Sequence, residues 1–305
     1  MGDHHQHSHS ELRGKKLGIT IILNITITIA QIFGGLVSGS LALLSDALHN
    51  FSDVISLLVS YAATRVFRRK SSGGKTFGYR RAEIIAALFN ATTLFLIAVF
   101  LVKEAIYRLW EPQVIGSVYV IGFGLLSIII NGGSVLLIKE DSKSSLNMRS
   151  AYLHLFTDMI TSIAVMAGGI AMYFWQIFWL DSVLSILIAV YLVLSSWDLL
   201  LKTLRVLMQF TPGDVDIKEI EKAIIAIPQV ENVHHVHVWQ LNENETHFEG
   251  HVDFKSDLVL SEITKICCVI SDLLKEKFNI GHSIIQPEFG MDDAKGLVVD
   301  RSECN

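Results

Sequence analysis

The stretch "LLSDALHNFSDVISLLV", residues 43–59, is apolar enough for a lipid bilayer but carries one histidine and two aspartates. A charged side chain at the bilayer centre costs about 2.5–3.5 kcal/mol on insertion scales, so an ionisable residue there indicates a functional site. If this stretch lies in a membrane, something must offset the cost of Asp46, His49 and Asp53.

The composition is that of a membrane protein. Of the 305 residues, 51% are hydrophobic and only 18% are charged, whereas soluble domains carry about 25% charged residues. The formal net charge of -5 gives no support for a nucleic-acid partner. The three cysteines form no CxxC pair, so neither a disulfide framework nor a thiolate metal site is indicated.

Six apolar stretches are long enough to cross a bilayer, which takes about 20 residues per helix. They are expected at 17–37, 41–66, 83–108, 115–138, 149–174 and 178–202. Lysines and arginines gather before the first span and in every second loop, and the alternate loops contain none. By the positive-inside rule, both termini are cytoplasmic.

The sequence changes character at Pro212, after the last span. The following 80 or so residues alternate in the order helix, strand, strand, helix, strand, which indicates a two-layer α+β domain. Asp214 is the expected N-cap of its first helix. The predicted organisation is a histidine-rich cytoplasmic arm (1–16), a six-helix transmembrane domain (17–208), a cytosolic αββαβ domain (209–290) and a loose tail (291–305).

Two spans contain the same pair of polar residues. His49 and Asp53 are four residues apart, so they share one face of a helix. His154 and Asp158 repeat the spacing in the fifth span. At 1.5 Å per residue, both pairs lie near the middle of their spans, which run in opposite directions. We therefore expect the four side chains to converge.

Two imidazoles and two carboxylates suit tetrahedral Zn²⁺ better than Mg²⁺ or Ca²⁺, which prefer oxygen shells. One divalent ion would also neutralise the two carboxylates. When the ion leaves, protons are the available replacement, because burial favours the protonated form of a carboxylate. The pattern predicts a metal ion exchanged for protons.

Other interpretations of the pattern are open. A single HxxxD motif can be an interhelical hydrogen-bonding pair, and Asp46 is expected to have such a structural role with serine or asparagine neighbours. An intramembrane zinc protease needs HExxH, which neither histidine starts, so no enzyme is expected. A passive channel would need weaker binding. A membrane metal sensor would leave the polar spans unexplained.

The motifs "GSLALLSDALHNFSD" (39–53), "FGYRRAE" (77–83) and "HSIIQPE" (282–288), with the second HxxxD, resemble the cation diffusion facilitator family, in its zinc-exporter-like branch. The resemblance covers about residues 15–290. It implies a homodimeric, proton-coupled exporter of Zn²⁺ that works by alternating access, with His49, Asp53, His154 and Asp158 as transport site. Broader efflux of Cd²⁺, Co²⁺, Ni²⁺, Fe²⁺ or Mn²⁺ is the alternative, although histidine at position 49 resembles the zinc-selective branch.

The resemblance also implies a metallochaperone-like, ferredoxin-like cytosolic domain that takes part in the dimer together with the transmembrane helices. It implies a regulatory metal site at His234, His251 and Glu288. By strand alternation, His235 and His237 are expected on the face opposite to His234.

Three further expectations concern the ends and loops of the chain. Lys75 and Tyr79 stand where some relatives have a second metal site, which is therefore not expected here. The histidine-rich stretch 4–9 is expected to be a flexible arm that binds metal weakly. Short loops favour a bacterial inner (cell) membrane.

Overall fold

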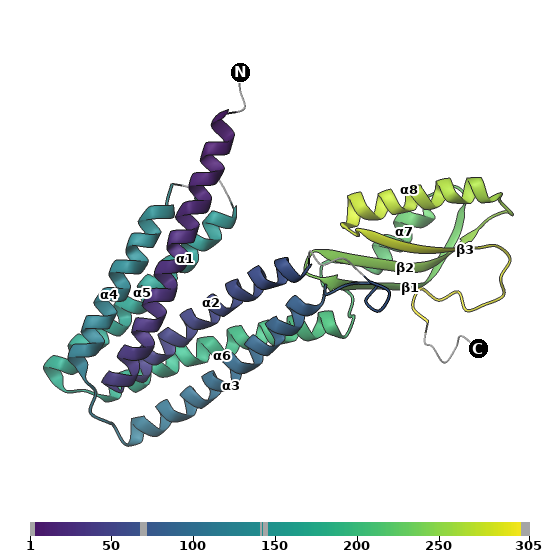
Figure 1. Ribbon diagram of the computed structural model, residues 1–305. Helices are drawn as coiled ribbons and strands as arrows, with labels where there is room; N and C mark the ends of the chain where they lie inside the picture. The colour runs from purple at the N-terminus through teal and green to yellow at the C-terminus, as the bar shows by residue number, and fades with distance from the viewer. Residues whose placement is uncertain (1–3, 68–71, 141, 143–145, 300–305) are drawn as a thin grey trace. The chain divides into compact units, whose positions relative to one another are not determined.

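The computed structural model describes residues 4–67, 72–140, 142 and 146–299 (Figure 1). Side chains are described from residue 18 onward, except at 56–67, 146–148 and 150. The chain divides into two compact units. One comprises Met1–Ala62 with Phe89–Leu200, and the other Ala63–Leu88 with Leu201–Asn305.

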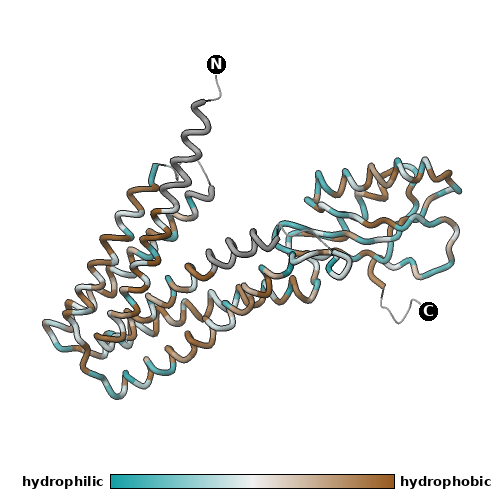
Figure 2. Tube along the Cα trace, viewed as in Figure 1, coloured by the Kyte–Doolittle hydropathy of each residue, from teal (hydrophilic) through white to brown (hydrophobic). Residues whose placement is uncertain are grey.

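Six long helices form the apolar part of the chain (Figure 2). They are α1 (His4–Ser38), α2 (Leu41–Phe67), α3 (Ala82–Trp110), α4 (Ser117–Ile138), α5 (Leu146–Trp175) and α6 (Trp179–Leu207). Among the described residues, five of them, all but α2, are long and apolar enough to cross a membrane. The side chains of α2 beyond residue 55 lie outside the description. The expected helical transmembrane domain is confirmed.

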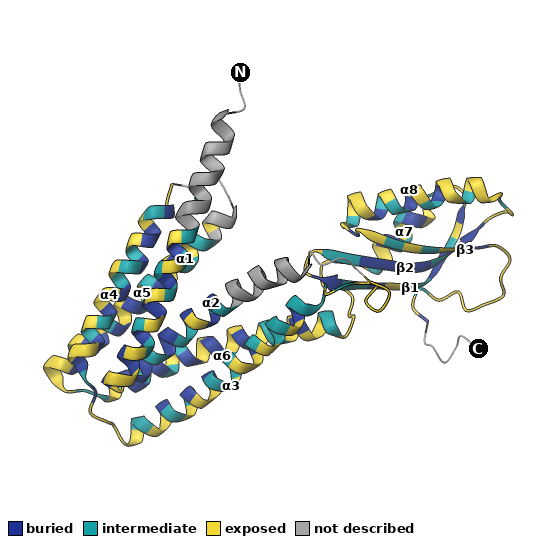
Figure 3. Ribbon diagram, viewed as in Figure 1, coloured by how far each residue is buried: buried dark blue, intermediate teal, exposed yellow. Residues whose placement is uncertain are grey.

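The outer faces of these helices are apolar and exposed (Figure 3). Phe89 is 76% exposed, Leu136 71% and Leu187 64%. Soluble proteins rarely expose contiguous apolar surface on this scale, so these faces are suited to lipid. The inner faces carry small and polar side chains, as transmembrane helix interfaces do.

The position of α2 is set by its first turn. Gly39 makes the turn from α1 with φ +72°, a conformation that favours glycine. The carboxylate of Asp181, at the start of α6, accepts a 2.8 Å hydrogen bond from the backbone N–H of Leu41. A carboxylate from another helix therefore caps α2, which fixes the helix that carries His49.

The C-terminal unit contains the expected αββαβ order. Its elements are α7 (Ile217–Ile225), β1 (Val230–Asn242), β2 (Glu245–Phe254), α8 (Leu260–Phe278) and β3 (His282–Glu288). β2 lies in the middle of the sheet, antiparallel to β1 and parallel to β3. Ile220 of α7, Phe248 of β2 and Leu274 of α8 meet in one hydrophobic core.

A β-bulge in β1 changes which side chains share a face. His234 pairs with His251 and His237 pairs with Glu249, so two residues of β1 stand opposite one of β2, and His235 has φ +51°. The expectation that His235 and His237 lie on the face opposite to His234 was wrong. The extra residue inverts the alternation of the strand, which turns these histidines to the same face.

The two ends of the chain also differ from expectation. The tail is not loose through residue 299: the N–H groups of His235 and Val236 donate to the carbonyls of Gly296 (3.1 Å) and Leu297 (2.8 Å). The tail thus supplies acceptors for backbone groups at the bulge. At the other end, α1 begins at His4, but the side chains of the histidine-rich stretch lie outside the described residues.

The N-cap of α7 is Asp216, not the expected Asp214, because Asp216 Oδ1 accepts a 2.8 Å hydrogen bond from the N–H of Lys218. We expect Asp216→Ala to destabilise the helix by about 1 kcal/mol. Faster amide hydrogen exchange across α7 in the whole protein would measure this loss. Asp214→Ala is the matched control, and equal exchange in the two variants would contradict the assignment.

Candidate metal centres

The two HxxxD pairs of the transmembrane unit meet between α2 and α5. Nε2 of His49 lies 3.8 Å from Asp53 Oδ2 and 3.7 Å from Asp158 Oδ1. Nε2 of His154 lies 3.3 Å from Asp53 Oδ2 and 3.6 Å from Asp158 Oδ2. The structure thus brings all four predicted residues together, with each imidazole between the two carboxylates.

These separations match the edges of a coordination tetrahedron. Four N or O ligands with metal bonds of about 2.1 Å lie about 3.4 Å apart when they surround a tetrahedral ion such as Zn²⁺. The four nitrogen–oxygen distances run from 3.3 to 3.8 Å. Ligand atoms of His49, Asp53 and His154 all lie within 4.8 Å of one another, so these three could hold one ion, with Asp158 beside the two imidazoles.

Three of the four carboxylate oxygens of this cluster have no hydrogen-bond partner among the described residues. Asp158 is 1% exposed, and neither of its oxygens has a hydrogen-bond partner among the described residues. Asp53 Oδ2 also has no hydrogen-bond partner among the described residues. A buried carboxylate without donors is costly, so the site calls for a bound cation or for protons.

An aromatic side chain from a third helix contacts this cluster. The ring of Tyr191, from α6, lies edge-on to His49 with centroids 5.8 Å apart, a contact that sequence spacing does not reveal.

Asp46 is 1% exposed and accepts a hydrogen bond from Gln31 Nε2 at 2.5 Å. Gln31 in turn accepts a bond from Asn50. This network supports a structural role for Asp46, with glutamine as its bonded partner.

The cytosolic domain has its own cluster of ligand side chains. Nε2 of His234 lies 3.4 Å from Glu288 Oε2 and 3.1 Å from Asp293 Oδ2. Nδ1 of His251 lies 2.7 Å from Glu288 Oε1. Ligand atoms of these four residues all lie within 4.8 Å of one another, so the group could hold a metal ion. Buried Glu288 Oε2 has no hydrogen-bond partner among the described residues, which suits a cation ligand.

Sequence reasoning missed three members of this cluster. Asp253 Oδ2 lies 3.2 Å from His234 Nδ1, and Asp293 and Lys295 come from the tail. Burial opposes the charge of Lys295, but its hydrogen bonds to Asp293 and Asp253 prevail and raise its pKa above the ordinary value. The hydrogen bond from Lys295 in turn lowers the pKa of Asp293. In the sequence, the motif "DDAK" (292–295) lies in a polar tail, and nothing in it indicated these contacts.

Other polar groups of the C-terminal unit lie in smaller sets. Lys75 donates a hydrogen bond to Tyr79, and Arg80 pairs with Glu245. The rings of His247 and His282 have centroids 4.7 Å apart, and burial together with His282 lowers the pKa of His247.

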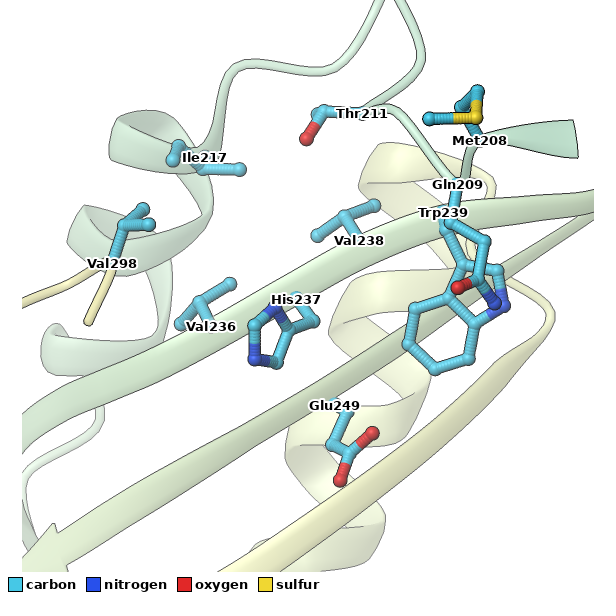
Figure 4. A pocket seen from close by; sticks show the side chains of 10 residues that line it. All are labelled: Met208, Gln209, Thr211, Ile217, Val236, His237, Val238, Trp239, Glu249 and Val298. Atoms are coloured by element: carbon cyan, nitrogen blue, oxygen red, sulfur yellow. The ribbon is translucent and has the colours of Figure 1, made fainter. Parts of the chain in front are cut away.

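A pocket of about 490 Å³ lies between the segment after α6 and the sheet (Figure 4). His237 and Glu249 are the two potential metal ligands among the residues that line it. The lining thus falls short of the three or four protein ligands of a zinc site.

Comparison with known proteins agrees with this architecture. Residues 17–208 match the cation efflux transmembrane domain, and residues 212–289 match the cytoplasmic domain of cation efflux proteins. The chain is 36% identical to the metal cation efflux system protein CzcD of Cupriavidus metallidurans over 288 residues, 94% of this chain and 90% of that protein.

Two further relatives are matched over nearly their whole length. Identity is 33% to the zinc transporter ZitB of Pectobacterium atrosepticum, covering 93% of this chain and 89% of the relative. It is 32% to the cadmium, cobalt and zinc/H(+)-K(+) antiporter of Bacillus subtilis, covering 92% and 91%. The chain therefore belongs to the cation diffusion facilitator family and is a multi-pass cation efflux transporter with a cytoplasmic C-terminal domain, not an enzyme.

Proposed function

We propose that this protein exports Zn²⁺ from the cytosol in exchange for protons, with His49, Asp53, His154 and Asp158 as the transport site. The observation that carries the proposal is the approach of the two imidazoles to the two carboxylates between α2 and α5, at nitrogen–oxygen distances of 3.3 to 3.8 Å. Relatives named as a zinc transporter and as a cadmium, cobalt and zinc/H(+)-K(+) antiporter support the cargo and the exchange, and one named as a metal cation efflux protein supports the direction.

Charge balance links the ion to its counter-ion. With neutral imidazoles, a divalent cation and the two carboxylates make a neutral set. Release of the cation leaves two negative charges at a site where Asp158 is almost completely buried. Protonation is the least costly way to restore neutrality, so uptake of protons follows release of the metal. In this scheme the cation and the protons compete for the same four side chains.

The site is accessible unevenly, which fits alternating access. His154 is 38% exposed and Asp53 31%, whereas Asp158 is 1% exposed. An ion could enter past the first two residues and be held against the third. A rocking of α2 and α5 relative to their neighbours would then open the site to the other side of the membrane.

A broader cargo is the second candidate. The Bacillus subtilis relative is named for cadmium and cobalt as well as zinc. Imidazole nitrogen suits Zn²⁺ and other transition metals, whereas carboxylate oxygen suits harder ions. The two histidines therefore favour transition metals such as Zn²⁺ over Mg²⁺ and Ca²⁺.

The rest of the assignment concerns assembly and place. We propose a homodimer in a bacterial inner membrane, in contact with lipid along its apolar faces. We also propose that the cytosolic cluster of His234, His251 and Glu288 binds a regulatory divalent cation. The contacts of these three residues with one another support that role.

We expect Asp158→Asn and Asp53→Asn each to reduce zinc transport by more than about 100-fold, since even changes to partners of metal ligands cost about 10–100-fold. Asparagine keeps the shape of the side chain but removes its charge. Uptake of Zn²⁺ into sealed vesicles with an imposed pH gradient measures the effect. Glu111→Gln, which neutralises an exposed carboxylate of the same unit, should retain full uptake. Normal uptake by either aspartate variant would refute the site.

We expect His49→Asp to admit Cd²⁺ more readily, because the resemblance associates aspartate at this position with broader selectivity. Initial uptake rates of Zn²⁺ and Cd²⁺ in the same vesicles measure the preference, and a change of about tenfold corresponds to 1.4 kcal/mol. His237→Asp makes the same substitution at an exposed position of the cytosolic domain and should leave the ratio unchanged. An unaltered ratio in His49→Asp would count against a role for His49 in selectivity.

A further inference from the structure

A lysine lies where the cytosolic cluster would otherwise hold unbalanced negative charge. Nζ of Lys295 is 2.9 Å from Asp253 Oδ1 and 3.7 Å from Glu288 Oε2, and it forms an ion pair with Asp293. Asp253 and Glu288 are each 7% exposed. One ammonium group therefore stands among three carboxylates, two of them buried, beside the ring of His234.

The backbone holds this lysine in place. Residues 291–299, here called the strap, run beside β1. Immediately after Lys295, the carbonyls of Gly296 and Leu297 accept hydrogen bonds from the two bulge residues of β1. The side chain of Leu297 packs against the hydrophobic core of the domain. The backbone next to Lys295 is thus held by contacts outside the acidic cluster.

We propose that Lys295 is a tethered cation that fills the cytosolic metal site while no metal is bound. A divalent cation binds by displacing the ammonium, and Asp293 joins His234, His251 and Glu288 as a ligand. The inference rests on the cytosolic site proposed above and is independent of the transport site between α2 and α5.

The metal ion and the ammonium of Lys295 would use the same oxygen atoms, so binding of one opposes binding of the other. Glu288 Oε2 lies 3.4 Å from His234 Nε2 and also 3.7 Å from the ammonium. Asp293 shares the same arrangement, with one oxygen on His234 Nε2 and the other paired to Lys295. A metal ion held by these oxygens and nitrogens would stand close to the ammonium. Repulsion between two cations at such a distance in a partly buried site favours release of the lysine.

Charge balance gives the lysine a function in both states. Without metal, the ammonium offsets part of the charge of Asp253, Glu288 and Asp293, so the cluster persists without strong repulsion. With metal, the ion takes over that task, and the free energy of breaking the ion pairs is subtracted from binding. Lys295 therefore sets the metal concentration at which the site fills, while the strap stays paired to β1.

Affinity of the whole protein for zinc tests the competition. Calorimetric titration of Zn²⁺ is made in a background of Asp53→Asn with Asp158→Asn, which disables the transport site. We expect Lys295→Gln to tighten binding by about tenfold, the scale of one hydrogen-bonded charged pair. Asp293→Asn should weaken it. Lys265→Gln removes an equal charge from an exposed position of α8 and should change nothing.

Chemical labelling gives a second readout that needs no substitution. Acylation of lysine amines by a small reagent, followed by mass spectrometry, should label Lys295 faster after Zn²⁺ is added, because the amine is released from its ion pairs. Lys265 should react equally in both states.

The possible failures can be told apart. Affinity in Lys295→Gln equal to that in Lys265→Gln, or labelling of Lys295 that does not respond to Zn²⁺, overturns the role of Lys295 alone. Zinc binding that is lost in Lys295→Gln also overturns the role of Lys295, whereas binding that is absent from the parent, or unaffected by His251→Ala, removes the cytosolic site and the inference with it. Neither result touches the transport assignment, which vesicle uptake tests separately.

Discussion

The structure depends on one constraint: a carboxylate buried among apolar helices must be neutralised. Asp158 has lost nearly all contact with solvent, and the described residues give its oxygens no hydrogen-bond donor. Its close neighbours are the imidazoles of His49 and His154. Because these groups change charge with protons and bind transition metals, the cost of the buried aspartate becomes a reason for the site to exchange one positive species for another.

The scaffold around α2 serves this constraint. The cap from Asp181, the turn at Gly39 and the hydrogen bonds of Asp46 with Gln31 fix α2 before it reaches His49. These contacts join α2 to α1 and α6, although Asp46 Oδ1 has no hydrogen-bond partner among the described residues. The site downstream differs because two imidazoles join its carboxylates, three of whose oxygens have no hydrogen-bond partner among the described residues. A selective binding site requires a rigid scaffold next to ligand atoms that have no hydrogen-bond partner of their own.

Sequence reasoning found what local spacing determines. The repeat of four residues between histidine and aspartate, the length of the apolar stretches and the alternation of the cytosolic strands predicted the spans, the convergence of His49 with Asp158 and the αββαβ order. It failed where residues far apart in the sequence determine the local structure. Strand alternation could not reveal the bulge at His235, and the tail gave no sign that Lys295 reaches Asp253. The shift of the N-cap from Asp214 to Asp216 lies within the usual uncertainty of helix ends.

The two clusters of the chain handle the same electrostatic problem differently. Between α2 and α5, the neighbours of the carboxylates are imidazoles, so the compensating charge has to come from outside and can leave again. In the cytosolic domain the compensating charge is covalently attached, at Lys295. A cargo site needs the first arrangement. The second is suited to a site that senses how much free cation surrounds it.

The bulge in β1 has a consequence for how this domain can evolve. Val233 and Val238 are five positions apart, an odd number, yet both belong to the same core. Their common orientation exists only because one surplus residue shifts the phase of the strand between them. Losing the codon of His235 would leave a regular strand in which the two valines, then four positions apart, still face the core. The loss would instead fall on the tail, because β1 would give up one of the two N–H groups that bond to residues 296 and 297, next to Lys295.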